Sequence, residues 1–65
     1  MTLAIELPRQ MARVARIAAD IAAQPDCGPA AEVMLEWIDM GAAAIAEQDP
    51  GRMMRAHRAL EGCNL

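Results

Sequence analysis

Few residues of this chain have side chains suited to acid–base or nucleophilic chemistry. The 65 residues include one His (His57), two Cys (Cys27 and Cys63) and one Thr (Thr2), with no Ser and no Tyr. A Cys–His nucleophile needs a third group that orients the base, and the sequence suggests none. Two Cys and one His so widely separated also lack the paired spacing of a zinc site. We therefore predict no enzyme activity, no metal site and no cofactor.

The charged residues are better suited to binding than to catalysis. Net charge is −3, from nine acids and six Arg with no Lys, and residues 25–48 alone carry −5. The flanking ranges 1–24 and 49–65 each carry +1. At helical spacing the acids form one stripe and the arginines form two. The acidic stripe is Glu32, Glu36, Asp39 and Glu47, and the arginine stripes are Arg9, Arg13 and Arg16, and Arg52, Arg55 and Arg58. Pairing of these stripes within or between chains is the simplest interpretation, and an anion or partner contact is the alternative.

The N-terminal stretch has the alternation expected of a short strand. Leu3, Ile5 and Leu7 alternate with smaller or polar residues over residues 2–7, and Pro8 follows. A period of two is typical of a half-buried strand, and Pro cannot donate to a strand ladder. Because no second strand candidate follows, we expect the same strand of a second copy to pair with it. The opening therefore predicts a homodimer.

Three helices are expected after the strand. The first runs from about residue 9 to 24, where two prolines and a glycine end it. The second begins at Pro29 and continues to Glu47 or Gln48, and Asp49 then caps a third over residues 50–61. Fifteen alanines and the absence of Phe and Tyr favour helix-on-helix packing around Trp37.

The order of these elements resembles the ribbon-helix-helix family, the Arc-repressor kind of DNA-binding protein. Residues 5–11 (IELPRQM) are similar to that family's strand-to-helix junction, and residues 31–38 (AEVMLEWI) resemble its second helix. The resemblance covers residues 2–48. It implies a mainly α fold, with a short N-terminal strand and three helices in an intertwined homodimer. Residues 1–48 would form the dimerisation domain, and residues 49–65 an appended helix that packs on it or binds a partner.

The resemblance also assigns roles to individual residues. In that family a two-stranded ribbon enters the major groove of operator DNA, and the second helix begins at a phosphate. DNA contacts would come from Thr2, Ala4, Glu6, Arg9, Arg13 and Gly28. The dimer core would contain Leu3, Ile5, Leu7, Val14, Val33, Trp37 and Ile38. Beyond the residues that the resemblance covers, the stripe of Arg52, Arg55 and Arg58 is the candidate for partner binding. The outward strand side chains depart from the family pattern, since none is the Arg, Lys, Asn or Gln that suits base edges.

Three functional hypotheses follow. The first is a homodimeric transcriptional regulator or antitoxin of ribbon-helix-helix type. The second is an acidic helical protein–protein interaction module, an inhibitor or adaptor that does not bind DNA. The third is an all-helical domain in which residues 2–7 form a disordered or docked arm. No membrane-length apolar stretch or signal-peptide pattern is present, so we expect a cytoplasmic protein with reduced Cys27 and Cys63.

Overall fold

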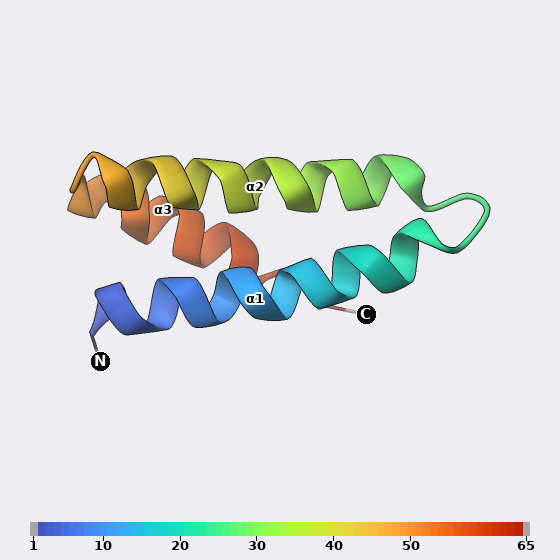
Figure 1. The fold of residues 1–65 in the computed structure, drawn as a ribbon, viewed down its shortest axis with the longest axis horizontal. Helices are drawn as coiled ribbons and strands as arrows, with labels where there is room; N and C mark the ends of the chain where they lie inside the picture. The colour runs from blue at the N-terminus through green and yellow to red at the C-terminus, as the bar shows by residue number, and fades with distance from the viewer. Residues whose placement is uncertain (1, 65) are drawn as a thin grey trace.

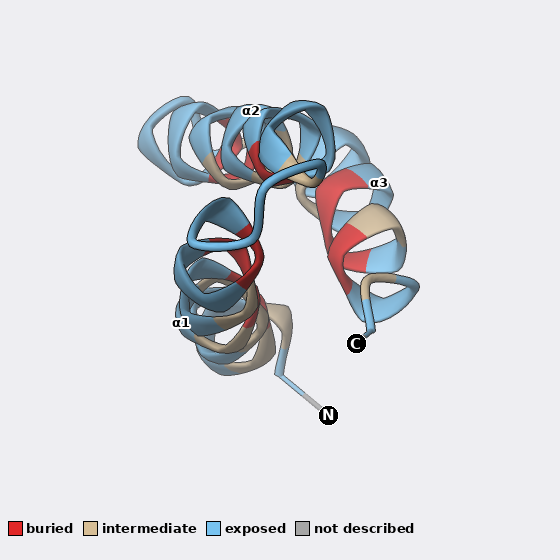
Figure 2. Ribbon diagram, turned by 90° about the vertical axis from the view of Figure 1, so that its right-hand side faces the viewer, coloured by how far each residue is buried: buried red, intermediate tan, exposed pale blue. Residues whose placement is uncertain are grey.

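Three helices make up the fold in the computed structural model, which describes residues 2–64 (Figure 1). α1 spans Leu3–Ala22, α2 spans Gly28–Ala46 and α3 spans Pro50–Glu61. α1 and α2 run antiparallel, and α3 packs against both of them (Figures 1 and 2). No helix within residues 2–64 is both long and apolar enough to cross a membrane.

The predicted N-terminal strand is wrong, because the described residues contain no strand and α1 already begins at Leu3. Thr2 is the extended residue before the helix, and its carbonyl accepts the backbone N–H groups of Ile5 and Glu6. Leu3 and Leu7 fit a period of two, but they are also one helical turn apart. As a helix the segment satisfies its own backbone, whereas an isolated strand cannot.

The same finding removes the basis of the predicted intertwined ribbon. Without a strand there is no ribbon for two chains to share, so the ribbon-helix-helix architecture is not the fold of this chain. Residues 49–65 are also more than an appendage, because Ala56 and Leu60 of α3 lie in the same core as Leu7 and Val14 of α1. One core therefore joins all three helices.

The later helix boundaries agree closely with the sequence. α3 has the predicted bounds, and the Asp49 side chain accepts the backbone N–H of Arg52 at 3.2 Å as its N-cap. α2 begins at Gly28 with Pro29 in its first turn and ends at Ala46. Strong local signals, caps and prolines, set these boundaries.

The buried core is small and rich in alanine. Leu7, Val14, Ala56 and Leu60 form its main cluster. A second cluster near the α1–α2 turn contains Ala18, Ile21 and Ala31. Figure 2 shows the buried residues of the three helices facing one another, with the outer surfaces exposed. Because alanines bury little area, many larger apolar side chains remain at the surface.

The end of α2 has a strained residue. Gln48 has φ 53°, in the left-handed region where glycine is favoured. Its N–H donates to the Ile45 carbonyl and the Asp49 N–H donates to the Ala44 carbonyl. This is the Schellman pattern of hydrogen bonds, which usually has Gly at this position.

Replacing Pro8 tests whether residues 3–7 are helical. Pro8 lies inside α1, where it lacks the N–H that would donate to the Ala4 carbonyl. We expect Pro8→Ala to raise the free energy of unfolding by about 1–3 kcal/mol, measured by urea denaturation followed by circular dichroism. Pro29→Ala is the control, because Pro29 is in the first turn of α2 and its missing N–H removes no helical bond. Equal effects of the two substitutions would contradict the helical N-terminus.

Replacing Gln48 tests the end of α2. Gln48→Gly should raise the free energy of unfolding by about 1 kcal/mol, because glycine adopts the left-handed conformation without a Cβ clash. Gln48→Ala should give no such gain, since alanine keeps the Cβ. Thermal denaturation of the three proteins side by side measures the difference, and a loss of stability in the glycine variant would contradict this geometry.

Candidate functional site

The outer surface of α2 is acidic. Glu32, Glu36 and Asp39 are spaced by four and three residues, so they lie on one face of the helix, and all three are exposed. None of the three is in an ion pair within residues 2–64. We call these three residues the acidic face. Its charge is left to solvent or to a partner.

The predicted pairing between acidic and arginine stripes is limited to one contact. Glu47 pairs with Arg52 across the α2–α3 turn. The other ion pair of the described chain joins Arg9 to Glu6 along α1, at 3.5 Å between Nη1 and Oε1. Both pairs are exposed enough that each contributes little to stability. Neither neutralises the acidic face.

Exposed apolar side chains border the acidic face. Val33 is 52% exposed and Met40 is 44% exposed, two turns apart on α2. Half-buried Trp37 lies between them, one turn from each. A hollow of about 20 Å³, with room for about one water molecule, lies between α2 and α3 and is lined by Trp37, Met40, Arg52, Arg55 and Ala56. The surface is an apolar edge beside a row of carboxylates, with too little space there for an organic ligand.

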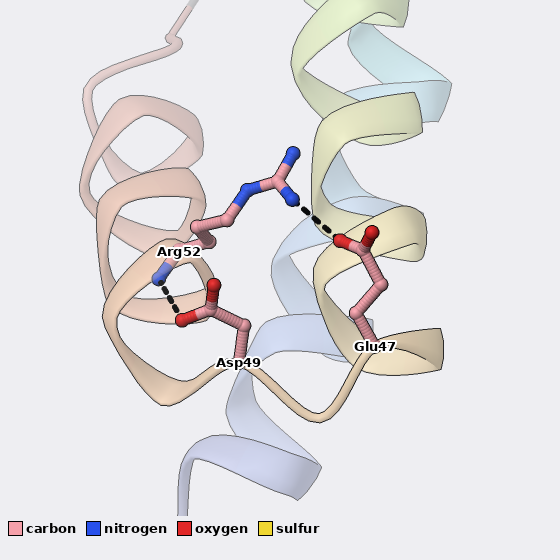
Figure 3. Close-up of polar contacts among 3 residues, drawn as sticks. All are labelled: Glu47, Asp49 and Arg52. Carbon is pink, nitrogen blue, oxygen red and sulfur yellow. Dashed lines mark hydrogen bonds and ion pairs between the residues drawn. The ribbon is translucent and has the colours of Figure 1, made fainter.

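The α2–α3 turn fixes one end of this surface. Arg52 is held twice, through its backbone N–H to Asp49 and through its guanidinium to Glu47 (Figure 3). One of the three arginines predicted to bind a partner is therefore engaged within the chain. Arg55 and Arg58 remain exposed on α3.

Arg13 has a structural role that the sequence did not indicate. Its guanidinium donates to the carbonyl of Leu60 at 2.7 Å and to that of Cys63 at 2.8 Å. Its Nε donates to the Gln10 side chain at 2.8 Å. Carbonyls at a helix C-terminus lack helical partners and attract cations. Arg13 thus ties the end of α3 to α1, and it is not free to contact a phosphate as the family resemblance implied.

The other residues assigned to DNA do not form one surface. Thr2 precedes α1, and Ala4 and Glu6 lie in its first two turns. Gly28 begins α2, close to the opposite end of α1 (Figure 1). The ribbon that would have aligned the N-terminal residues is not formed, so this set has no common groove-facing side.

The residues assigned to a dimer core mostly fill the core of one chain. Leu7 and Val14 are fully buried. Leu3, Trp37 and Ile38 are half-buried against the same cluster. Ile5 and Val33 are each more than half exposed. Of the residues assigned to the dimer core, only Ile5 and Val33 have side chains that are mostly exposed to a partner.

The candidate catalytic residues are separated or buried. His57 is 4% exposed in the core face of α3. Cys27 and Cys63 are free thiols, and each makes only a weak contact to an oxygen near it in sequence. Within residues 2–64, no three His, Cys, Asp or Glu side chains are grouped so as to hold a metal ion.

Two further exposed apolar residues of α2 received no role from the sequence. Leu35 is 49% exposed and lies beyond Asp39 on the side of the acidic face away from Val33. Ile45 is 36% exposed and lies on the side of α2 opposite Glu36. The sequence could have identified them through their position around the helix relative to Glu32 and Asp39.

Comparison with protein-family models, with curated proteins and with solved structures finds no match to this chain. Its function is therefore inferred from its own geometry.

Replacing Arg13 tests its role at the end of α3. Arg13→Met keeps much of the side-chain volume but removes the guanidinium donor to the Cys63 carbonyl and one of the two donors to the Leu60 carbonyl, which also accepts the Cys63 N–H. We expect the free energy of unfolding to fall by roughly 1–3 kcal/mol in chemical denaturation of dilute protein. Arg9→Met is the matched control, because the Arg9 side chain is 72% exposed and its ion pair contributes little. Similar losses in both variants would contradict the role given to Arg13.

Proposed function

We propose that this chain is a protein–protein interaction module, an inhibitor or adaptor, whose acidic face on α2 binds a basic segment of another protein. The observation that carries the proposal is a set of three carboxylates that form no ion pair within residues 2–64, bordered by exposed Val33 and Met40.

The charge distribution supports a basic partner. The acidic face lies within residues 25–48, which carry −5, so their field extends beyond the individual carboxylates. Such a field raises the rate of encounter with a cationic surface and disfavours an anionic one. It also accounts for a row of carboxylates that stabilises nothing within the chain.

The apolar border supports a partner segment that is amphipathic. Val33, Trp37 and Met40 follow one another along α2 at helical spacing. Methionine adapts its shape to a bound surface, and a partly exposed Trp is a common anchor in interfaces. A basic helix with apolar residues on one side would place them on this border and its cations on the acidic face.

Duplex DNA is the less suitable partner. Binding to DNA depends on neutralising phosphates, and this chain carries −3 overall. Arg13 is engaged with backbone carbonyls, and Arg52 with Glu47. Exposed Arg55 and Arg58 of α3 and exposed Arg9 and Arg16 of α1 lie on different helices, and they leave the net charge negative.

A synthetic peptide tests this proposal. The probe is an amphipathic helix of Leu and Lys, and its counterpart has Glu in place of Lys. Trp37 is the single Trp of the chain and lies beside the face, so its fluorescence reports binding. We expect the Lys peptide to bind more tightly at low than at high salt. Glu36→Lys should weaken that binding roughly tenfold, a change of about 1.4 kcal/mol.

The controls distinguish charge-dependent binding from nonspecific hydrophobic binding and from DNA binding. Arg58→Gln, on α3, should leave peptide binding unchanged. The Glu peptide and a mixed-sequence DNA duplex should not bind at physiological salt. Equal binding of both peptides, or no effect of Glu36→Lys, would contradict the proposal. Salt-sensitive binding of the duplex in preference to the peptide would contradict it as well.

A further inference from the structure

A second apolar surface lies on the side of α1 and α2 that faces away from α3. Around α1, the Met11 sulfur lies beside Gly41 of α2, and Arg13 bonds to the end of α3. The residues that follow Met11 around the circumference of α1, in the direction away from Arg13, are Ala4, Pro8, Ala15 and Ala19. All four are exposed. Leu35 and Ile45 of α2 lie along the same side. We call these six residues the back face.

The back face carries no charge and is broad. Figure 2 shows the sides of α1 and α2 that are turned away from α3 as largely exposed. The chain is 37 Å long. Two adjacent helices are about 20 Å wide, so this side offers an area on the order of 700 Å². Stable interfaces bury about 800 Å² per partner.

The borders of the back face carry opposite charges. Past its alanines, α1 presents exposed Arg16 and exposed Arg9, the second of which is in the weak ion pair with Glu6. Past Leu35, α2 presents Glu32 and Asp39 of the acidic face. One edge of this surface is therefore basic and the opposite edge is acidic, which a suitably placed second copy would complement.

We propose that this chain forms a homodimer through the back face, with a two-fold axis parallel to α1 and α2. That axis places α1 of one copy against α2 of the other, and it brings the basic edge of each copy onto the acidic edge of its partner. A two-fold axis perpendicular to the helices would instead set acid against acid. Isologous contacts of this kind are the common form of dimer.

The levels along the helices agree with this arrangement. α1 and α2 are antiparallel with Met11 beside Gly41, and Ala18 and Met34 pack in one cluster. Rotation about an axis parallel to the helices does not change the position of a residue along that axis. The partner's Leu35 then lies over Ala15 and Ala19, and the partner's Ile45 lies over Ala4 and Pro8. The partner's Asp39 falls between Arg9 and Arg16, so large side chains meet small ones and cations meet an anion.

This proposal goes beyond the proposed function, and the two share part of the acidic face, so a basic segment meets all three carboxylates only on the monomer. The dimer uses the Glu32 and Asp39 side of the acidic face, and it leaves Glu36, Val33 and Met40 accessible. Sedimentation without any peptide tests the dimer, and peptide binding to a monomeric variant tests the proposed function, so the failure of one is distinguishable from the failure of the other.

Sedimentation velocity over a range of concentrations is the first experiment. We expect the wild-type chain to be dimeric at high micromolar concentration. Ala15→Glu, which puts a charge at the centre of the back face, should raise the dimer dissociation constant at least roughly tenfold. Ala30→Glu is the control, because it adds the same charge at an exposed α2 position outside the back face. Circular dichroism of both variants confirms that the helices are retained.

A charge exchange tests the direction of the axis. Arg16→Glu and Asp39→Arg should each weaken the dimer, and the double variant should restore it, because the pair is re-formed with reversed signs. A chain that stays monomeric to millimolar concentration would overturn the proposal, as would a dimer that Ala15→Glu leaves intact. A double variant no better than the single variants would overturn the parallel axis.

Discussion

The meeting of the three helices at Gly41 is the contact on which the rest of the structure depends. A Cβ at this position would lie 3.3 Å from the Met11 sulfur, and 3.6 Å from both the Ala56 Cβ and a methyl group of Leu7. The first of these distances is tighter than most packed contacts, so the Met11 side chain would have to shift by a few tenths of an ångström to admit a Cβ. With glycine there, Leu7 and Leu60 reach full burial in a core built largely of alanine.

A core built this way has a consequence for the surface. Close helix approach through small residues leaves little interior volume for the larger aliphatic side chains of α2. Val33 and Met40 therefore emerge on one side of the acidic face and Leu35 on the other, while Ile45 stays exposed on the opposite side of α2. A chain of this length buries a modest fraction of its surface alone. Partners that cover these two apolar edges would supply the burial that the single chain lacks.

Arg13 and the carboxylates of α2 have different roles because their surroundings differ. Arg13 is drawn inward because its guanidinium reaches the Leu60 carbonyl in the last turn of α3 and the Cys63 carbonyl just beyond that helix. The carboxylates of α2 are exposed and form no ion pair within residues 2–64. Arg13 thus helps to fix the fold, while the acidic face is left exposed.

Local signals in the sequence determined the breaks between helices, the start of α3 at its Asp49 cap and the acidic face of α2. These depend on the residue and its neighbours within one turn, so no knowledge of the fold is needed. Local signals did not determine the secondary structure of residues 3–7, because Leu3 and Leu7 fit both a strand and a helix. Tertiary packing decided it: only as a helix do both leucines join Val14 and Leu60 in one core while the backbone bonds to itself. The role of Arg13 was likewise beyond the sequence, since its acceptors lie about fifty residues away and are backbone carbonyls that no residue type marks.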